Sequence, residues 1–311
     1  MSIMIRSNFQ DVYDNLLPAI DTVYFQSKEL DETDAPWQKL FSMKKSTKQF
    51  ENLTGFSGFG LFGQVGEAED VPLMGITQLH DKKFTHTKFA AAWQVSEEME
   101  DDDQYELVAT LARAFARSYR FTKEVNFANV LNNGFTTELA ADGVAAFGSR
   151  TLFNGTVVNN STAADYGVSA AQTMYNHFDT LIDDQGIRAK LRPAYIAANP
   201  AMKWIIGEVN RSKYHPAAVT TSGSNNQNAI NVLAEYDLDE VYWAELTDTD
   251  AWYVFAKPSA VNGFGLRGYD RQKFTVSTDF YTRNLTMVSV GRGRWSRGVY
   301  DWRQGYGSTG T

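Results

Sequence analysis

The sequence predicts an α+β protein built around one very long helix and several strand-rich segments. Between Asp101 and Asn132, apolar residues recur at spacings of three and four, which is helical periodicity. Helix and strand patterns then alternate through residues 166–262, which indicates a compact α/β unit. After Gly268, apolar and polar residues alternate with period two, which is typical of strands. These three patterns together define the α+β class.

Composition narrows the function before any motif is considered. The chain has 311 residues, 43% of them hydrophobic, enough for one large domain or two modest ones. It contains no cysteine, which excludes disulfides, zinc–thiolate sites and thiol nucleophiles. A net charge of −8 argues against a general nucleic-acid binder. Because no apolar run approaches ~18 residues and the N-terminus lacks a signal-peptide pattern, we expect a soluble protein without a membrane segment.

Residues 1–50 read as an extended arm. Its helical piece, roughly Asn8 to Leu17, ends before Pro18, and its apolar residues fall at helical spacing: Phe9, Val12, Tyr13, Leu16 and Leu17. Pro36 and the polar run KKSTKQ leave the arm without a core of its own. We therefore expect the arm to lie on another surface.

Residues 51–95 predict a long β-hairpin with a glycine-rich outgoing limb and an acidic tip before Pro72. The returning limb places Phe89, Ala91, Trp93 and Val95 on one face by alternation. A long two-stranded hairpin is only marginally stable by itself in water. It should therefore need a partner surface.

The long helix should span Asp101 to Asn132, after an N-cap at Ser96 or in the EDDD run, and stop at Asn-Asn-Gly. At 1.5 Å per residue it would be about 48 Å long. Two stripes are expected along it. The apolar one contains Val108, Leu111, Phe115, Tyr119, Phe121, Val125 and Ala128, and the charged ridge contains Arg113, Arg117, Arg120 and Glu124.

Two cap signals punctuate the α/β segment. Ser169 with Gln172 forms a capping-box pattern for one helix, and Asn199-Pro200 is an N-cap pattern for the next.

The charge is unevenly distributed along the chain. The segment 263–303 carries a net charge of +5, so the rest of the chain carries −13. A basic tract in an acidic chain favours pairing with another copy or with a polyanion, although a solvated basic edge explains it equally well.

No catalytic or cofactor pattern survives inspection. GFGLFG (58–63) and GFGLRG (263–268) match G-x-G-x-x-G, but Gly66, Pro72 and Gly75 break any helix after the first. The second runs into a strand pattern. His80 and His86 are better explained as ordinary side chains than as metal ligands. We predict no enzyme, cofactor or metal, and a nucleotide-binding α/β enzyme is the rival reading from another class.

Several strings occur in an order that resembles one family: PWQKLFSMKKSTKQFENLTGFSGFG, the acidic tip through Pro72, FAAAWQVSEEM running into the long helix, RPAYIAANPAM, and ELTDTDAWYVFA. Together they resemble a tailed-phage major capsid protein of the Hong Kong 97 fold, closest in character to the Mu-like head subunits. The resemblance covers about residues 36–303. An encapsulin-like compartment with the same fold is the alternative.

The resemblance implies a division of the chain. Residues 1–50 would be an N-terminal arm along an adjacent subunit and 51–95 the extended E-loop hairpin. Residues 96–165 and 263–311 would form the peripheral domain, with a spine helix at about 101–132. Residues 166–262 would form the axial domain, which gathers around the five-fold and six-fold axes.

Candidate contact residues follow from the same reading. The expected inter-subunit contacts are Phe56, Phe59, Phe62, Glu67, Glu69, Asp70, Lys82, Lys83, Arg113, Arg117 and Arg120. The acidic tip would meet basic residues of a neighbour, either the helix ridge or the late arginines; a solvated acidic loop is the alternative. Arg292, Arg294 and Arg297 would face the lumen and touch packaged DNA weakly.

The implied partners are copies of the chain itself, as hexamers and pentamers of an icosahedral shell around double-stranded DNA. A separate scaffold protein, a portal and a decoration protein would complete the particle. The protein would be part of the virion, assembled in the bacterial cytoplasm. Lysines on the hairpin could donate to covalent cross-links, but no sequence feature identifies an acceptor.

Overall fold

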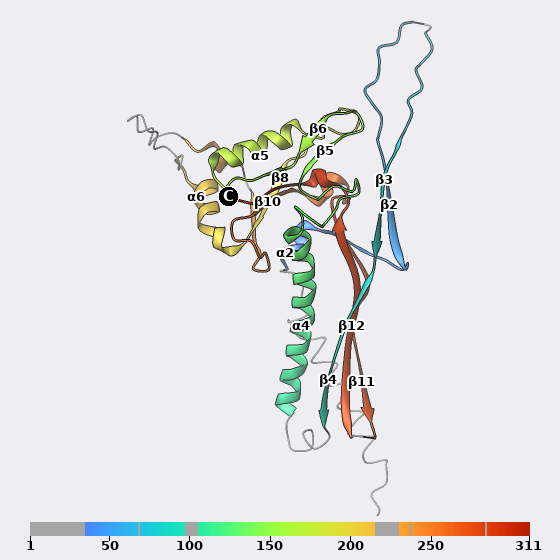
Figure 1. Ribbon diagram of the computed structural model, residues 1–311, viewed down its shortest axis with the longest axis vertical. Helices are drawn as coiled ribbons and strands as arrows, with labels where there is room; N and C mark the ends of the chain where they lie inside the picture. The colour runs from blue at the N-terminus through green and yellow to red at the C-terminus, as the bar shows by residue number, and fades with distance from the viewer. Residues whose placement is uncertain (1–34, 68, 97–104, 215–229, 237, 284) are drawn as a thin grey trace, which may run out of the picture.

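The computed structural model describes residues 35–67, 69–96, 105–214, 230–236, 238–283 and 285–311. The expected arm helix near Asn8 and the expected cap in the EDDD run lie outside these ranges. Two bodies are visible in Figure 1, each built on its own sheet, with a hairpin projecting beside them. The α+β class predicted from the sequence is confirmed.

The first body is a four-stranded sheet in the order β1-β11-β12-β4. Its strands are β1 (Ser42–Lys45), β11 (Leu266–Tyr281), β12 (Thr286–Val299) and β4 (Thr87–Ser96). β1 pairs in parallel with β11, and the other two pairings are antiparallel. The short helix α2 (Pro36–Leu40) leads into β1, and Trp37 stacks on Phe127 with ring centroids 4.6 Å apart.

Helix α4 (Tyr105–Asn132) lies along one face of this sheet. Small and aromatic side chains make the contact: Ala112 and Ala116 pack with Val95 and Met287. The predicted alternation of the returning limb is confirmed, because Phe89 stacks on Trp295 at 4.1 Å and Trp93 packs in the same cluster. β4 therefore belongs to this sheet rather than to the hairpin.

The apolar stripe of the helix differs from the prediction. The side chain of Val108 lies outside the described residues, and Leu111, Phe121 and Val125 are 38%, 42% and 40% exposed. Ala128 is buried and Phe115 and Tyr119 are half-buried, as the predicted stripe requires. The other buried positions are Ala112, Ala116, Lys123, Phe127, Val130 and Leu131. The prediction missed Ala112 and Ala116, where the helix approaches the sheet closely and small residues fit.

The hairpin consists of β2 (Phe50–Phe56) and β3 (Gln78–Thr85), which pair antiparallel. It is shorter than the predicted 51–95, because the chain after Thr85 turns into β4 and pairs with β12. Its base covers the sheet on the side opposite α4, where Phe84, Tyr269 and Tyr300 form a buried cluster. Helix and hairpin thus sandwich the sheet (Figure 1).

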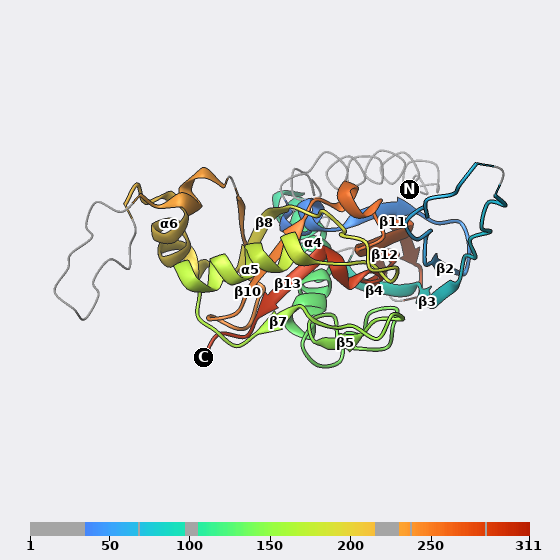
Figure 2. The ribbon, with the colours of Figure 1, turned by 90° about the horizontal axis from the view of Figure 1, so that it is seen from above.

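The second body is a five-stranded sheet in the order β7-β13-β10-β8-β9. Its strands are β7 (Ser161–Thr162), β13 (Gly305–Ser308), β10 (Trp252–Ala256), β8 (Pro193–Ala198) and β9 (Asp239–Tyr242). Two helices accompany it, α5 (Val168–Thr180) and α6 (Lys203–Arg211), and α6 lies at the end far from the hairpin (Figure 2). A small separate pair, β5 (Ser149–Thr151) and β6 (Val157–Asn159), precedes them.

The C-terminal strand departs from the predicted division. Residues 263–311 were assigned to the peripheral unit, but β13 pairs with β10 and β7 inside the five-stranded sheet. Gly305 and Gly307 permit this, since a Cβ at either position would lie 2.8 or 2.9 Å from a ring carbon of Phe255 or Phe147. The pairing is long-range, so no local pattern reveals it.

The cap signals had mixed outcomes. Helix α5 begins at Val168 after Gly167 and has no side-chain cap, so the Ser169–Gln172 capping box is wrong. Asn199 does cap the 3₁₀ turn η2 (Pro200–Met202) that leads into α6, because its side chain accepts a hydrogen bond from the amide of Ala201. Further 3₁₀ turns are η3 (Val232–Glu235), η4 (Pro258–Val261) and η5 (Trp302–Gln304).

Neither glycine motif opens a helix. The described residues between β2 and β3, which include GFGLFG, form no helix or strand, and GFGLRG enters β11. Asn262 and Gly263 have φ of 53° and 67°, which makes the turn from η4 into that strand. Gly268 is required for packing, since a Cβ there would overlap the sulfur of Met43. The prediction that no helix follows either motif is confirmed for the described residues.

Candidate functional site: the assembly surfaces

The base of the hairpin is fixed to the body by buried polar contacts. Lys82 Nζ donates to the carbonyls of Leu139 and Val299, the latter at 2.8 Å, and lies 3.6 Å from a carboxylate oxygen of Glu138. Burial lowers the pKa of Lys82, while Glu138 opposes that shift. The side chain is only 19% exposed. Lys82 is therefore engaged mainly within its own chain, and the expected inter-subunit contact stays a prediction.

Two further side chains, Tyr300 and His86, hold the base. The hydroxyl of Tyr300 donates to the carbonyl of His80 at 3.1 Å. Gly55 leaves room for that hydroxyl, since a Cβ at Gly55 would lie 2.6 Å from it. His86 is buried between the hydroxyls of Ser46 and Ser296, each 3.0 Å from a ring nitrogen, and burial lowers its pKa. Lys83 stays exposed, with Nζ 4.0 Å from the ring centroid of Phe50.

The tip of the hairpin is the opposite case. Phe59 and Phe62 are 54% and 91% exposed, and Phe56, at the end of β2, is 67% exposed, as the prediction of surface anchors requires. The tip also exposes apolar residues that the sequence reading missed: Leu61, Val65, Val71, Leu73 and Ile76. The string VPLMGI was the available signal. So many large apolar side chains on one projecting segment mark an interaction surface.

The acidic residues Glu67, Glu69 and Asp70 occupy the same tip and are exposed. One carboxylate oxygen of Glu69 accepts a hydrogen bond from the amide of Gly66 at 2.8 Å. Within the described ranges, no ion pair joins these three carboxylates to a basic residue. The tip therefore presents negative charge and apolar surface together.

The predicted arginine ridge lies on the solvent side of α4. Arg113 and Arg117 are exposed and Arg120 is half-buried. The guanidinium of Arg117 lies 5.2 Å from the ring centroid of Phe121. Burial raises the pKa of Glu124, and Arg120 opposes that shift. The ridge runs along the flank of α4, beside the side that packs on the sheet.

The three late arginines do not share a face, although all were expected to line the lumen. Arg297 points toward α4, where its Nε donates to the carbonyl of Asn126 at 2.5 Å, and burial lowers its pKa. Arg292 and Arg294 have the opposite parity on β12 and lie on the side away from α4. In the β12–β4 register, the exposed Arg292 lies opposite Ala90, and Arg294 lies opposite Lys88. Arg297 is thus engaged within its own chain.

That side of the sheet is open below the hairpin base. Its exposed residues are small or polar on β4, namely Lys88, Ala90, Ala92 and Gln94, with Ser277 and Asp279 on β11. We call these residues, with Arg292 and Arg294, the open sheet face. Its basic residues, Lys88, Arg292 and Arg294, lie on neighbouring strands β4 and β12.

The outer end of the second body exposes a further apolar group that the sequence reading missed. Trp204 on α6 is 82% exposed, and Ile205, Tyr214, Ile230, Val232 and Tyr236 are also exposed. The periodicity of KWIIGEV could have shown it, because Ile206 and Val209 take the buried side and leave Trp204 outside. Tryptophan in the open is typical of an interface.

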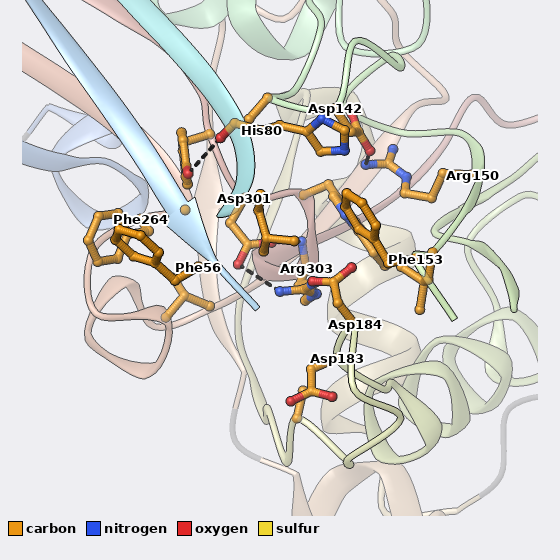
Figure 3. A pocket seen from close by; sticks show the side chains of 18 of the residues that line it. Phe56, His80, Asp142, Arg150, Phe153, Asp183, Asp184, Phe264, Asp301 and Arg303 are labelled. Carbon is orange, nitrogen blue, oxygen red and sulfur yellow. Dashed lines mark hydrogen bonds and ion pairs between the residues drawn. The ribbon is translucent and has the colours of Figure 1, made fainter. Parts of the chain in front are cut away.

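A cavity of about 450 Å³ lies where the hairpin base meets both bodies. Figure 3 shows Phe56 and Phe264 on one side of Arg303 and Phe153 and Asp184 on the other. Arg303 pairs with Asp184 and, at 3.5 Å, with Asp301, and Arg150 pairs with Asp142 at 3.1 Å. Burial lowers the pKa of Arg150 to about 10, against the pull of Asp142. These carboxylates are engaged by arginine or by backbone amides, so the cavity has the character of a structural joint.

Among the described residues, no group of three histidines or carboxylates is placed to bind a metal. His80 packs near Phe153 while His86 is buried between two serines, so the two histidines point into different surroundings. No helix in the described ranges is long and apolar enough to cross a membrane.

Both the sequence and the fold are similar to those of phage capsid proteins. The family model described as phage capsid protein matches residues 81–308. A capsid structure of Cyanophage P-SCSP1u aligns with a TM-score of 0.56 and 11% identity, covering 88% of each chain. A structure from Microbacterium phage Oxtober96 aligns at 0.54 and 9% identity, over 89% of this chain and 91% of that one. The capsid of an empty GTA particle aligns at 0.54 and 14%, over 88% of each.

No curated protein matches the sequence. The solved structures share too little identity to show more than the fold, which is that of Hong Kong 97-like phage capsids. The family model covers well over half of the chain and carries the assignment beyond the fold. The chain belongs to the phage capsid protein family, whose members are the structural shell subunits of phage heads.

Proposed function

We propose that this chain is the major capsid protein of a tailed phage, a non-enzymatic subunit that assembles as hexamers and pentamers into an icosahedral head around double-stranded DNA. The observation that carries the proposal is the hairpin. Its base is locked by Lys82 and Tyr300, and its tip exposes Phe59, Phe62 and a set of carboxylates. A rigidly held arm with an unsatisfied end suits a contact with another copy.

The layers of the subunit indicate where the tip docks. The hairpin lies on one side of the four-stranded sheet and α4 on the other. Subunits of one ring are related by rotation, so with the sheet parallel to the shell wall each layer meets the same layer of its neighbours. The acidic tip then reaches the open sheet face, with Lys88, Arg292 and Arg294, in preference to the arginine ridge of α4.

The exposed group around Trp204 suits a second contact of the shell. It lies at the end of the second body farthest from the hairpin (Figure 2). Within a ring, a heterologous contact joins different patches of successive copies. This group would provide one of those patches near the five-fold and six-fold axes.

The remaining parts of the proposal concern partners and place. A separate scaffold protein, a portal and a decoration protein complete the particle, and assembly takes place in the bacterial cytoplasm. Likeness to the Mu-like head subunits also stays a prediction. Packaged DNA is a second candidate partner for Arg292, which is exposed, and for Arg294, which is half-buried on the same face and donates from Nε to the carbonyl of His86 at 3.4 Å.

Electron microscopy tests the proposal directly. We expect the expressed chain, alone or with its scaffold, to form closed icosahedral shells after size-exclusion chromatography. A stable monomer or dimer under every condition would contradict the proposal. Shells that enclose protein cargo instead of DNA would indicate an encapsulin-like compartment.

Charge reversal tests the tip contact. The triple change Glu67→Lys, Glu69→Lys and Asp70→Lys should impair assembly while the subunit unfolds at an unchanged temperature. Each exposed pair contributes at most ~1 kcal/mol, so the effect depends on repetition across many contacts. Compensating changes Arg292→Glu and Arg294→Glu should restore shells. Normal particles from the acid-reversed variant would disprove the contact. Salt-insensitive DNA retention in particles with the original arginines would count against a DNA role for Arg292 and Arg294.

A further inference from the structure

Helix α4 carries a second apolar seam on its outward side. The residues Leu111, Ala114, Ser118, Phe121 and Val125 follow one another at spacings of three, four, three and four, and all are exposed. This is the heptad spacing by which one helix packs against another. The sheet-facing side of α4 uses different positions, among them Ala112 and Ala116. The outward seam is therefore additional to the packing that the fold already uses.

The seam has a charged border on one side. Arg113, Arg117 and Arg120 run parallel to it along the helix. Arg117 leans over the ring of Phe121, with 5.2 Å from the guanidinium carbon to the ring centroid. From Leu111 to Val125 the seam is about 21 Å long at 1.5 Å per residue. A complementary partner is an acidic amphipathic helix of roughly three to four turns.

The sequence predicts such a helix within residues 1–34, which lie outside the described ranges. This segment contains seven carboxylates and two basic residues, a net charge of −5. Its expected helix, from Asn8 to Leu17, has Phe9, Val12 and Leu16 at spacings of three and four. Asp11 and Asp14 lie off that apolar stripe. Seam and segment thus match in both apolar spacing and charge.

The entry point of the chain favours the helix of the same copy. Trp37 stacks on Phe127 of α4, and Lys123 Nζ lies 4.8 Å from the ring centroid of Trp37. The 17 residues from 18 to 34 can span up to about 56 Å. That reach exceeds the length of the seam. A tethered segment also binds at an effective concentration near millimolar.

We propose that the N-terminal segment, residues 1–34, docks as a helix along the outward seam of α4 in its own subunit, with its carboxylates beside Arg113, Arg117 and Arg120. The inference concerns the free subunit and does not depend on shell assembly. The neighbouring copy's segment or hairpin tip would be the other occupants, and the experiment separates them.

The absence of cysteine makes a site-specific test simple. Leu16→Cys is combined, in the full chain, with Leu111→Cys, Ser118→Cys, Phe121→Cys or Val125→Cys in turn, and treated with a short bismaleimide. The matched control pairs Leu16→Cys with Ser277→Cys, which is exposed on the open sheet face away from α4. We expect intrachain cross-links at one or two adjacent seam positions and none at the control.

A mixture of two size-tagged chains, each carrying one cysteine, reports links between copies. Cross-links mainly between copies, equal yields at Ser277, or no seam cross-link would each overturn the proposal.

The rate of cross-linking in the best pair tests the proposed charge pairing. Arg113→Glu, Arg117→Glu and Arg120→Glu together should slow cross-linking roughly fivefold or more at low salt, and adding Asp11→Lys and Asp14→Lys should restore it. An unchanged rate would overturn the charge pairing, and an unchanged unfolding temperature shows that the variants are folded.

Discussion

The base and the tip of the β2–β3 hairpin differ in how their side chains find partners. At the base, Phe84 is 2% exposed and Lys82 is bonded to carbonyls of residues far along the chain. At the tip, Phe62 is 91% exposed and Leu73 is fully exposed. The base of the hairpin therefore contributes to the stability of the subunit, while the tip leaves its apolar side chains exposed to solvent. Mutations at the two ends should have separable effects.

The largest expected effect is on folding. Phe84→Ala removes a ring from the cluster with Tyr269 and Tyr300 and should lower the free energy of unfolding by ~3–5 kcal/mol. Chemical denaturation of the free subunit measures it. The matched control is Phe62→Ala at the tip, where the loss should stay within ~0.5 kcal/mol. Similar losses at both ends would break the comparison.

The reverse pattern is expected for assembly. Phe59→Ser with Phe62→Ser should leave the unfolding temperature of the subunit unchanged and strongly reduce shell yield, because exposed aromatic anchors dominate many interfaces. Light scattering during assembly gives the measurement. Phe153→Ser is the matched control, since this phenylalanine is 58% exposed but lies outside the hairpin and is not among the expected contacts. Wild-type yield from the double variant would mean that the tip makes no important contact.

The variant Lys82→Met tests how much the buried lysine contributes to fixing the hairpin base. It keeps the aliphatic stem but removes the ammonium group from the carbonyls of Leu139 and Val299, leaving these acceptors and Glu138 without that partner. We expect a loss of about 1–3 kcal/mol in unfolding free energy. Hydrogen exchange should also quicken in β3 and leave β10 unaffected. If stability is retained in Lys82→Met, the buried cluster alone holds the hairpin.

The smallest effect concerns pH. Burial lowers the pKa of His86 below 6.5, so in the folded state this residue takes up a proton less readily than in the unfolded chain. Its contribution to stability is full above pH 6.5 and is lost as the pH falls toward the folded pKa. Unfolding temperatures between pH 7.5 and 5 should fall less steeply in His86→Gln than in wild type. If the unfolding temperatures of the two proteins fall equally with pH, the buried state of His86 does not contribute to this pH dependence.

Much of the fold could be predicted from local pattern. The period-two alternation from Phe89 to Val95 identified the face of β4 that meets α4, and Asn199-Pro200 identified a real cap. The same rule would have separated Arg297 from Arg292 and Arg294, since their positions on one strand differ in parity. The helix stripe was harder, because close packing buried Ala112 and Ala116 and left larger residues outside.

Long-range pairing accounts for the rest. Nothing near Lys82 shows that the carbonyls of Leu139 and Val299 will surround it. Likewise β13 joins the five-stranded sheet through partners about fifty and 145 residues away in sequence. For the candidate surfaces, exposed tip aromatics followed from composition, but the group around Trp204 required knowing which side of α6 is covered.

The return of the C-terminus to the second body has a mechanical consequence. The chain passes between the two sheets after α4, between β10 and β11, and again between β12 and β13. Two bodies joined by a single linker can rotate freely relative to each other. Three separate connections restrict that rotation. In a shell, such a subunit should transmit force from one body to the other through all three crossings.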